Sequence, residues 1–253
     1  VVPKSLQQRT VKWYHDRLMH PGETRTELSI AQHYYWKGLR STVQYVCRRC
    51  ENCRLNKPTA RESRGYGHLP EKEAESIPWH KVCIDLIGPY EFGKVTKRNG
   101  KVVSDTTTTL SALTMIDPAT GWFEIVEIPN KRADIVANKF EQTWLNRYPW
   151  PQEVVMDRGT EFMGEIKTLL KDEYGIKRKP ITSRNPQANS MVERAHKTLH
   201  NLVNANIIRG TQDLDKDDPW TGVLTAVRFG MNSTVHTTNR ATPAQLVFGR
   251  DTM

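Results

Sequence analysis

Apolar residues recur at spacings of three and four in three segments near the start of the chain, residues 6–19, 24–33 and 39–49. This spacing is typical of one face of an α-helix, so we expect three helices. Pro21 and Gly22 separate the first helix from the second. A chain of about fifty residues buries too little surface to be stable without a staple. The pattern therefore predicts a small helical module that something else must stabilise.

From residue 82 onward the pattern changes to short apolar runs, which are typical of strands. These runs cover residues 82–87, 110–116, 123–128, 153–156 and 176–180. The first ends at Gly88-Pro89, and the turn at residues 117–121 joins the second to the third as a hairpin. Helical spacing follows at residues 132–147, 164–174, 188–206 and 219–248, with a polar break at 236–240. Three strands and then alternating strands and helices predict a mixed α/β sheet covered by helices.

The stretch between the two patterns is polar, has three prolines and two glycines, and lacks any apolar period. Such a composition is typical of a linker. We therefore expect a helical domain at residues 1–56, a linker at 57–77 and an α/β domain at 78–253.

The net charge of +9 is concentrated in the first quarter of the chain. Residues 1–70 contain 13 basic and 5 acidic residues, whereas residues 71–253 contain 24 and 23. A basic segment of this kind fits a polyanion such as DNA or RNA, and it also fits a solvated surface. The chain has neither an apolar run of membrane-spanning length nor a signal-peptide profile, so we expect no membrane association. It also lacks a first methionine, which indicates a piece of a longer polypeptide.

Two histidines and two cysteines form a candidate zinc site. Four residues lie between His15 and His20, and 29 residues lie between His20 and Cys50, which forms a C-x-x-C pair with Cys53. Zn²⁺ prefers four N and S ligands in a tetrahedron, and such a site supplies folding energy to a small domain. Four protein ligands leave no place for water, so one structural zinc ion is expected.

Alternatives exist for each of these residues. C-x-x-C can be a redox motif, but no βαβ pattern surrounds it here, and the histidines could be ordinary surface residues. Cys47 forms a second C-x-x-C with Cys50, yet it continues the helical spacing, so Cys53 is the preferred ligand. His33 is a spare candidate that fits a structural role better.

Three carboxylates form a candidate catalytic centre. Asp85 lies within an apolar strand, Asp157 ends another, and Glu193 lies in the helix predicted at 188–206. Singly, they could be a buried ion pair, a turn cap and a solvated helix residue. Together they could hold two Mg²⁺ or Mn²⁺ ions for phosphoryl transfer, because hard cations need several oxygen ligands.

Polar and basic side chains accompany the last of these carboxylates. One helix face carries Glu193 and three basic or titratable residues at helical spacing, and a proline-containing loop precedes the helix. These groups could hold a phosphate backbone, although the loop could also be an ordinary polar one. The candidate DNA-contacting residues are Arg184, Asn185, Gln187, His196, Lys197 and His200.

The two motif sets together resemble retroviral and retrotransposon integrases, most closely those of the gypsy type. The H-x4-H…C-x-x-C module resembles the zinc-binding domain of these enzymes, and 35 residues separate Asp157 from Glu193 as in their D,D-35-E triad. Further similar segments are Pro78-Trp79 and residues 157–162, 185–187 and 242–250. This sequence differs from the integrase pattern at two places. It has His196 where many relatives have Asn, and Ser190-Met191 where a glycine is common.

This resemblance implies a zinc-stapled three-helix bundle followed by an RNase H-like core with a mixed five-stranded sheet. It implies a polynucleotidyl transferase that trims the 3′ ends of element DNA and joins them to target DNA with two metal ions. The implied partners are element termini, target DNA, further copies in a dimer or tetramer, and chromatin factors. The implied location is the nucleus, and the cytoplasmic element particle before integration. Relatives continue into a small β-barrel domain, which is absent from these 253 residues.

Two other functions remain open at this stage. The first is an RNase H-like nuclease or a cut-and-paste transposase, against which the zinc motif and the 35-residue spacing count. The second is a domesticated integrase that only binds DNA, against which the complete carboxylate triad counts.

Overall fold

A computed structural model describes residues 2–56, 75–98, 101–159, 162, 164–180, 196 and 221–251. Most of the predicted linker at 57–77 lies outside this part of the chain. The helix predicted at 188–206 also lies outside it, except for His196. In the described part, no helix combines the length and the apolar character that a membrane crossing needs.

The N-terminal module contains the three predicted helices, α1 (Lys4–Arg17), α2 (Glu23–Ala31) and α3 (Leu39–Arg49). A fourth short helix, α4 (Glu51–Asn56), follows the three predicted ones. Six residues are too few to show an apolar period, so the sequence pattern missed α4. The helices share a small core of Val2, Val11, Tyr14, Leu18, Ile30, Trp36, Leu39, Val43 and Cys47.

Five strands form one mixed sheet in the order β3-β2-β1-β4-β5. They are β1 (Lys81–Arg98), β2 (Lys101–Ile116), β3 (Phe123–Ile128), β4 (Glu153–Met156) and β5 (Lys177–Pro180). The first three strands pair antiparallel, and β4 and β5 are parallel to β1. This arrangement confirms the predicted mixed five-stranded sheet of an RNase H-like core.

The hairpin of β1 and β2 is much longer than the sequence pattern predicts. The prediction that the first strand ends at Gly88-Pro89 is wrong, because β1 continues to Arg98. The peptide bond between Gly88 and Pro89 is cis, and the pairing register shifts between Ile87 and Tyr90. This irregularity lets the ladder continue past the proline, which has no N–H to donate.

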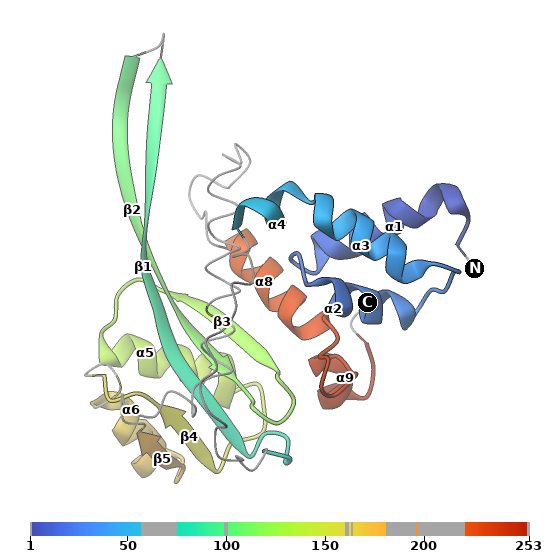
Figure 1. Cartoon of the computed structure of the whole chain (residues 1–253). Helices are drawn as coiled ribbons and strands as arrows, with labels where there is room; N and C mark the ends of the chain where they lie inside the picture. The colour runs from blue at the N-terminus through green and yellow to red at the C-terminus, as the bar shows by residue number, and fades with distance from the viewer. Residues whose placement is uncertain are drawn as a thin grey trace, which may run out of the picture.

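Helices cover both faces of the sheet (Figure 1). One face packs on α5 (Ala133–Phe140), the π-helical segments η1 (Glu141–Leu145) and η3 (Leu169–Glu173), and α6 (Glu165–Thr168). The other face packs on α8 (Thr221–Ser233) through Val223, Leu224 and Val227. Alternate residues of β1 point to opposite faces, so Val82 and Ile84 join the first core and Cys83 and Ile87 the second.

The N-terminal module packs against α8 and the last helix, α9 (Pro243–Phe248), as Figure 1 shows. The Ser29 hydroxyl accepts a hydrogen bond of 3.2 Å from the buried backbone N–H of Val235. His33 Nε2 lies 3.2 Å from the carboxylate of Asp251, which agrees with the structural role preferred for this histidine. Residues more than two hundred positions apart therefore join the two ends of the chain.

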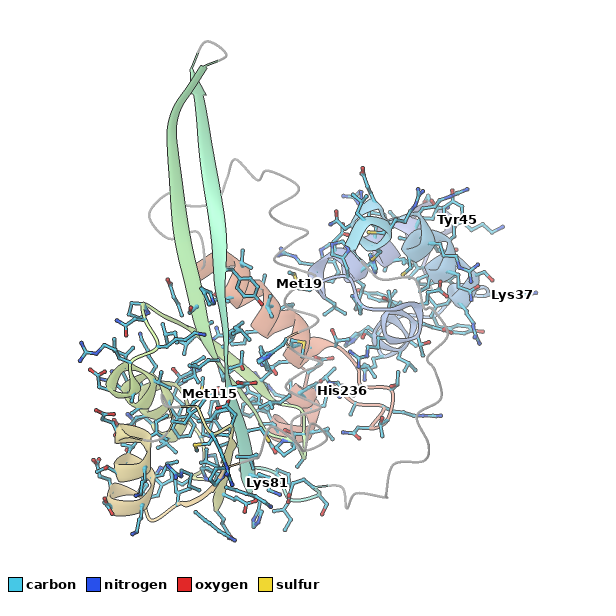
Figure 2. All side chains as sticks on the ribbon, turned by 60° about the vertical axis from the view of Figure 1, so that its left-hand side comes forward. Met19, Lys37, Tyr45, Lys81, Met115 and His236 are labelled. Carbon is cyan, nitrogen blue, oxygen red and sulfur yellow. The ribbon has the colours of Figure 1, made fainter. Side chains whose placement is uncertain are left out.

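Gly230 of α8 faces Leu18 and Met19 of the N-terminal module. Figure 2 shows Met19 between the N-terminal helices and α8. A Cβ atom at Gly230 would lie 2.8 Å from Met19 Cγ and 3.1 Å from the backbone oxygen of Leu18. Only a residue without a side chain lets the two backbones approach this closely.

Gly230→Leu is expected to lower the free energy of unfolding by about 1–3 kcal/mol, because the larger side chain forces the N-terminal module away from α8. The matched control is Gly222→Leu on the same helix, where nothing lies within 4 Å of the added Cβ. Leucine is the better helix former, so the control is expected to be neutral or slightly stabilising. Urea unfolding followed by circular dichroism measures both variants. Equal stability of the two would contradict the close contact.

Candidate functional site

The candidate zinc ligands come from three places in the N-terminal module. His15 lies in the last turn of α1, Cys50 ends α3, and Cys53 lies in α4. Met19 and His20 have φ angles of 62° and 56°. This left-handed backbone turns the chain sharply after α1, and His20 N–H donates a 2.7 Å hydrogen bond to the carbonyl oxygen of His15. The turn brings the second histidine back beside the first.

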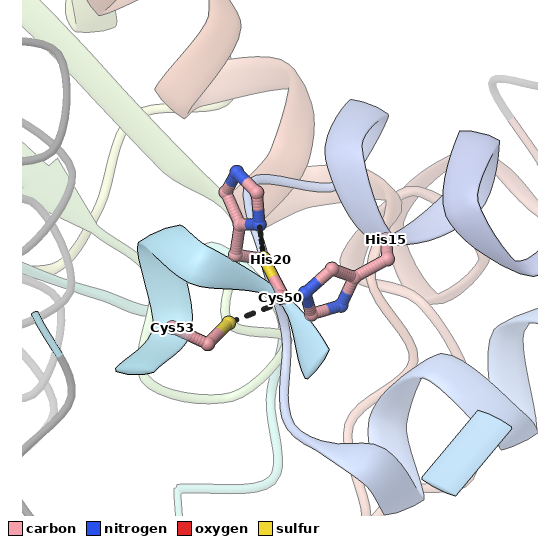
Figure 3. A group of neighbouring side chains, drawn as sticks. All are labelled: His15, His20, Cys50 and Cys53. Carbon is pink, nitrogen blue, oxygen red and sulfur yellow. Dashed lines mark hydrogen bonds between the residues drawn. The ribbon is translucent and has the colours of Figure 1, made fainter. Parts of the chain in front are cut away.

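The four ligand atoms converge on one point, as Figure 3 shows. His15 Nε2 lies 3.2 Å from Cys53 Sγ, and His20 Nδ1 lies 3.4 Å from Cys50 Sγ. All four ligand atoms lie within 4.8 Å of one another. Zn–N and Zn–S bonds in a tetrahedron separate the ligand atoms by roughly 3.3–3.8 Å, so this group fits Zn²⁺.

Two further side chains contact the outer nitrogens of the histidine rings. Cys47 Sγ lies 3.5 Å from His15 Nδ1, and the Asn52 side-chain amide lies 3.0 Å from His20 Nε2. Such partners fix the ring orientation and the nitrogen that faces the metal. Cys47 is a buried residue of α3, which agrees with the preference for Cys53 as a ligand. Sequence reasoning missed Asn52, whose only signal was its place within the C-x-x-C loop.

Asp85 and Asp157 each lie two residues beyond the last pair of the β1–β4 ladder. In the β1–β4 ladder, Val82 pairs with Val154 and Cys83 with Val155. Continuing this register by two residues places Asp85 opposite Asp157, which directly follows β4. Neighbouring strands lie about 4.8 Å apart, and residues two positions along a strand share a face. Both aspartates therefore belong to the face that α8 covers, at the point where β4 ends.

Local hydrogen bonds orient both carboxylates. Asp85 Oδ1 accepts a hydrogen bond of 2.8 Å from the N–H of Leu86. Asp157 Oδ1 accepts a hydrogen bond of 3.0 Å from the N–H of Gly159. The Asp157 residue is exposed, whereas the Asp85 side chain retains 22% of its accessible surface. The pair thus combines a partly enclosed carboxylate with an open one.

His196 lies beside Asp85. Its Nδ1 is 3.8 Å from Asp85 Oδ2, and its Nε2 is 2.8 Å from the Thr114 hydroxyl oxygen. Burial lowers the pKa of His196 to about 4, so the ring is neutral at pH 7. His196 therefore adds no positive charge beside the Asp85 carboxylate at this pH.

Thr114 contacts both His196 and Asp85. It was not among the site residues predicted from the sequence. Asp85 pairs with Thr114 in the β1–β2 ladder, and the threonine hydroxyl donates a hydrogen bond of 3.0 Å to the backbone oxygen of Asp85. A threonine within a strand is unremarkable in one sequence, since β-branched residues are common there. Only the hairpin register identifies it as the neighbour of a functional carboxylate.

The remaining predicted site residues lie outside the described part of the chain. Glu193 is one of them, and it precedes His196 by three positions in the sequence. The others are the DNA-contact candidates Arg184, Asn185, Gln187, Lys197 and His200. Of the predicted catalytic and DNA-contacting residues, the structure thus places Asp85, Asp157 and His196.

Comparison with known proteins confirms the resemblance to retroviral and retrotransposon integrases. Residues 2–59, which include the whole zinc group, match the family model of the integrase zinc binding domain. The chain is 28% identical over 231 residues to the retrovirus-related Pol polyprotein from transposon 412 of Drosophila melanogaster. It is 22% identical over 244 residues to the transposon Tf2-3 polyprotein of Schizosaccharomyces pombe.

These matches cover 91% and 96% of this chain but only 17% of each polyprotein. Among solved structures, a chain of the simian T-cell lymphotropic virus intasome, in complex with PP2A regulatory subunit B56 gamma, is similar with a TM-score of 0.53. That match is 16% identical in sequence and covers 93% of this chain and 73% of the other. The chain is therefore similar to the integrase region of retroelement polyproteins, and its zinc group and its sheet agree with that similarity.

Proposed function

We propose that this chain is the integrase segment of a retroelement polyprotein, which trims the 3′ ends of element DNA and joins them to target DNA. The observation that carries the proposal is the parallel pairing of β1 with β4, which ends at Cys83↔Val155. Asp85 and Asp157 each lie two residues beyond this last pair, so the same register would bring them to one face of the sheet. A zinc group that matches the integrase zinc-binding domain supports it independently.

Asp85, Asp157 and Glu193 would together hold two Mg²⁺ or Mn²⁺ ions. Bound ions of this kind activate the attacking oxygen of water or of a DNA 3′ hydroxyl and stabilise the leaving oxygen. The hydrogen bonds from Leu86 and Gly159 keep the aspartates oriented before any metal arrives. Since phosphoryl transfer of this type needs no covalent enzyme intermediate, no serine or tyrosine nucleophile is assigned.

His196, Lys197 and His200 would hold the terminal nucleotides, together with Arg184, Asn185 and Gln187 of the preceding loop. The neutral ring of His196 suits hydrogen bonding to a base or sugar better than charge pairing with a phosphate. The proposed partners are element termini, target DNA and further copies of the chain, with action in the nucleus.

A joining assay tests this function. The chain is incubated with Mg²⁺ and a labelled duplex that carries the terminal sequence of the parent element, beside the Glu193→Gln variant and a chelator control. Products longer than the substrate, lost in both controls, are the expected result. Cleavage of an RNA–DNA hybrid without joining would assign a nuclease instead. DNA binding with neither cleavage nor joining would reduce the protein to a binding module.

A further inference from the structure

The long β1–β2 hairpin extends well beyond the sheet that supports it (Figure 1). β3 pairs with β2 only at Ser111–Ile116, and β4 pairs with β1 only at Lys81–Cys83. The ladder of β1 and β2 nevertheless continues from Tyr90↔Leu110 to Arg98↔Lys101. We call this part, strand residues 90–98 and 101–110, the ribbon. Nine residues of strand make it roughly 30 Å long.

Within the described part of the chain, the ribbon stands apart from the other strands and the helices. No third strand pairs with it in the part of the chain that the structure describes, and both side views show it apart from the helices (Figures 1 and 2). A two-stranded ribbon alone is only marginally stable in water. Its unpaired edges also invite association with something else. A partner that covers the ribbon would therefore stabilise it.

The charge at the far end of the ribbon indicates which partner. Between positions 94 and 101 the sequence has four basic residues, Lys94, Lys97, Arg98 and Lys101, and no acidic one. The rest of the chain from residue 71 onward has 20 basic and 23 acidic residues. A concentration of four positive charges at the tip of a projecting element is complementary to a phosphate backbone.

We propose that the ribbon is a DNA-binding arm that contacts double-stranded DNA outside the carboxylate site. A two-stranded β-ribbon fits the major groove of B-DNA, which is about 12 Å wide. Basic residues at its tip would contact phosphates and hold the duplex without reading its sequence. The inference rests on the proposed function for its choice of DNA over other polyanions.

The salt dependence of DNA binding tests the arm. The full chain is titrated with a labelled duplex of random sequence at several salt concentrations, beside a variant with Lys94→Gln, Lys97→Gln, Arg98→Gln and Lys101→Gln. The slope of log affinity against log salt is expected to fall by about 2–4, since each lost phosphate contact removes about 0.9. Affinity at low salt is expected to fall at least about tenfold.

The matched control removes the same charge elsewhere. Lys167, Lys171, Lys177 and Lys179 are exposed residues of α6, η3 and β5, and their fourfold change to Gln is expected to leave the slope unchanged. If the slope of log affinity against log salt is the same for the two fourfold variants, the proposal that the ribbon binds DNA is wrong. A second variant, in which an Asn-Gly turn replaces residues 91–109, shortens the hairpin without removing the sheet pairs. It is expected to lose the same salt dependence, and wild-type binding by this variant would also overturn the proposal.

Two further readouts separate the possible failures. If the ribbon instead pairs with a second copy, light scattering will show a smaller assembly for the shortened variant with unchanged DNA binding, which overturns the arm. If the chain joins DNA but its DNA binding does not depend on the ribbon, the proposal that the ribbon binds DNA is wrong and the proposed function is unaffected. Ribbon-dependent binding without any joining overturns the proposed function and leaves the arm standing.

Discussion

Removal of metal from the group of His15, His20, Cys50 and Cys53 is expected to unfold the four N-terminal helices while the sheet domain stays folded. The core of this module consists of nine buried apolar residues, which is too small to stabilise about fifty residues without a staple. Structural zinc sites contribute roughly 10 kcal/mol or more of binding free energy at pH 7. This is the largest stability effect that the structure predicts.

Circular dichroism before and after chelation measures the helix loss, and hydrogen exchange locates it. Amides of residues 2–56 are expected to lose protection, whereas those of β1 and β4 keep it. Leu18 and Met19, which directly precede the ligand His20, contact Gly230 of α8. Chelation is therefore also expected to raise exchange along α8. Protected N-terminal amides after complete zinc removal would contradict the assignment.

The three clustered cysteines allow a matched comparison. Cys53→Ser is expected to abolish zinc binding and reproduce the chelation result. Cys47→Ala is expected to retain one zinc per chain, because Cys47 Sγ contacts the outer nitrogen of the His15 ring, Nδ1, and not the nitrogen in the four-ligand group. Zinc content measured by mass spectrometry distinguishes the two variants. Loss of zinc from the Cys47 variant alone would exchange the roles of the two cysteines.

Asp85→Asn is expected to reduce DNA joining by about 10³-fold while the fold and DNA binding persist. The substitution keeps the shape of the side chain but removes a negative charge that cations need. A bound metal contributes several kcal/mol of charge stabilisation to phosphoryl transfer, and each 1.36 kcal/mol corresponds to a factor of ten. Asp157→Asn is expected to have the same effect, because Asp157 is proposed to hold the same metal ions.

Joining of a labelled duplex in Mg²⁺ measures the loss, and a gel-shift assay checks that DNA still binds. Asp172→Asn, an exposed residue of η3, is the control with the same charge change and is expected to behave as the wild type. Wild-type joining by Asp85→Asn would remove that residue from the catalytic centre, and a lower melting temperature would assign the loss to misfolding.

Several elements follow from local sequence alone. The apolar run at residues 123–128 is the strand β3, and the run at 153–156 is β4, with the predicted bounds. These segments are short, apolar and rich in β-branched residues, and turn residues bound them, so local preference and packing agree. The long hairpin was missed for the opposite reason. Its outer residues are mostly polar, and pairing between the strands defines them rather than an apolar pattern.

For the zinc site too, the sequence predicted some residues and the structure alone revealed others. Ligand type and short spacing identified the zinc group. Two histidines with four residues between them and a C-x-x-C pair are local features that the sequence displays directly. The partners of those ligands were not visible in the sequence, and Asn52 gained its role only from the packing of α4 on His20. Local spacing identifies ligands, whereas the residues that orient them depend on how helices pack.

By itself, the sequence determined which residues have the chemistry for zinc and for divalent cations, and where most helices and strands lie. Only the tertiary structure decided that β1 pairs with β4, 72 positions further along the chain, and that Ser29 bonds to Val235. Spacing and side-chain type are local properties that one sequence displays directly. Strand register and domain packing are set by long-range contacts among buried residues, whose partners a single sequence does not specify.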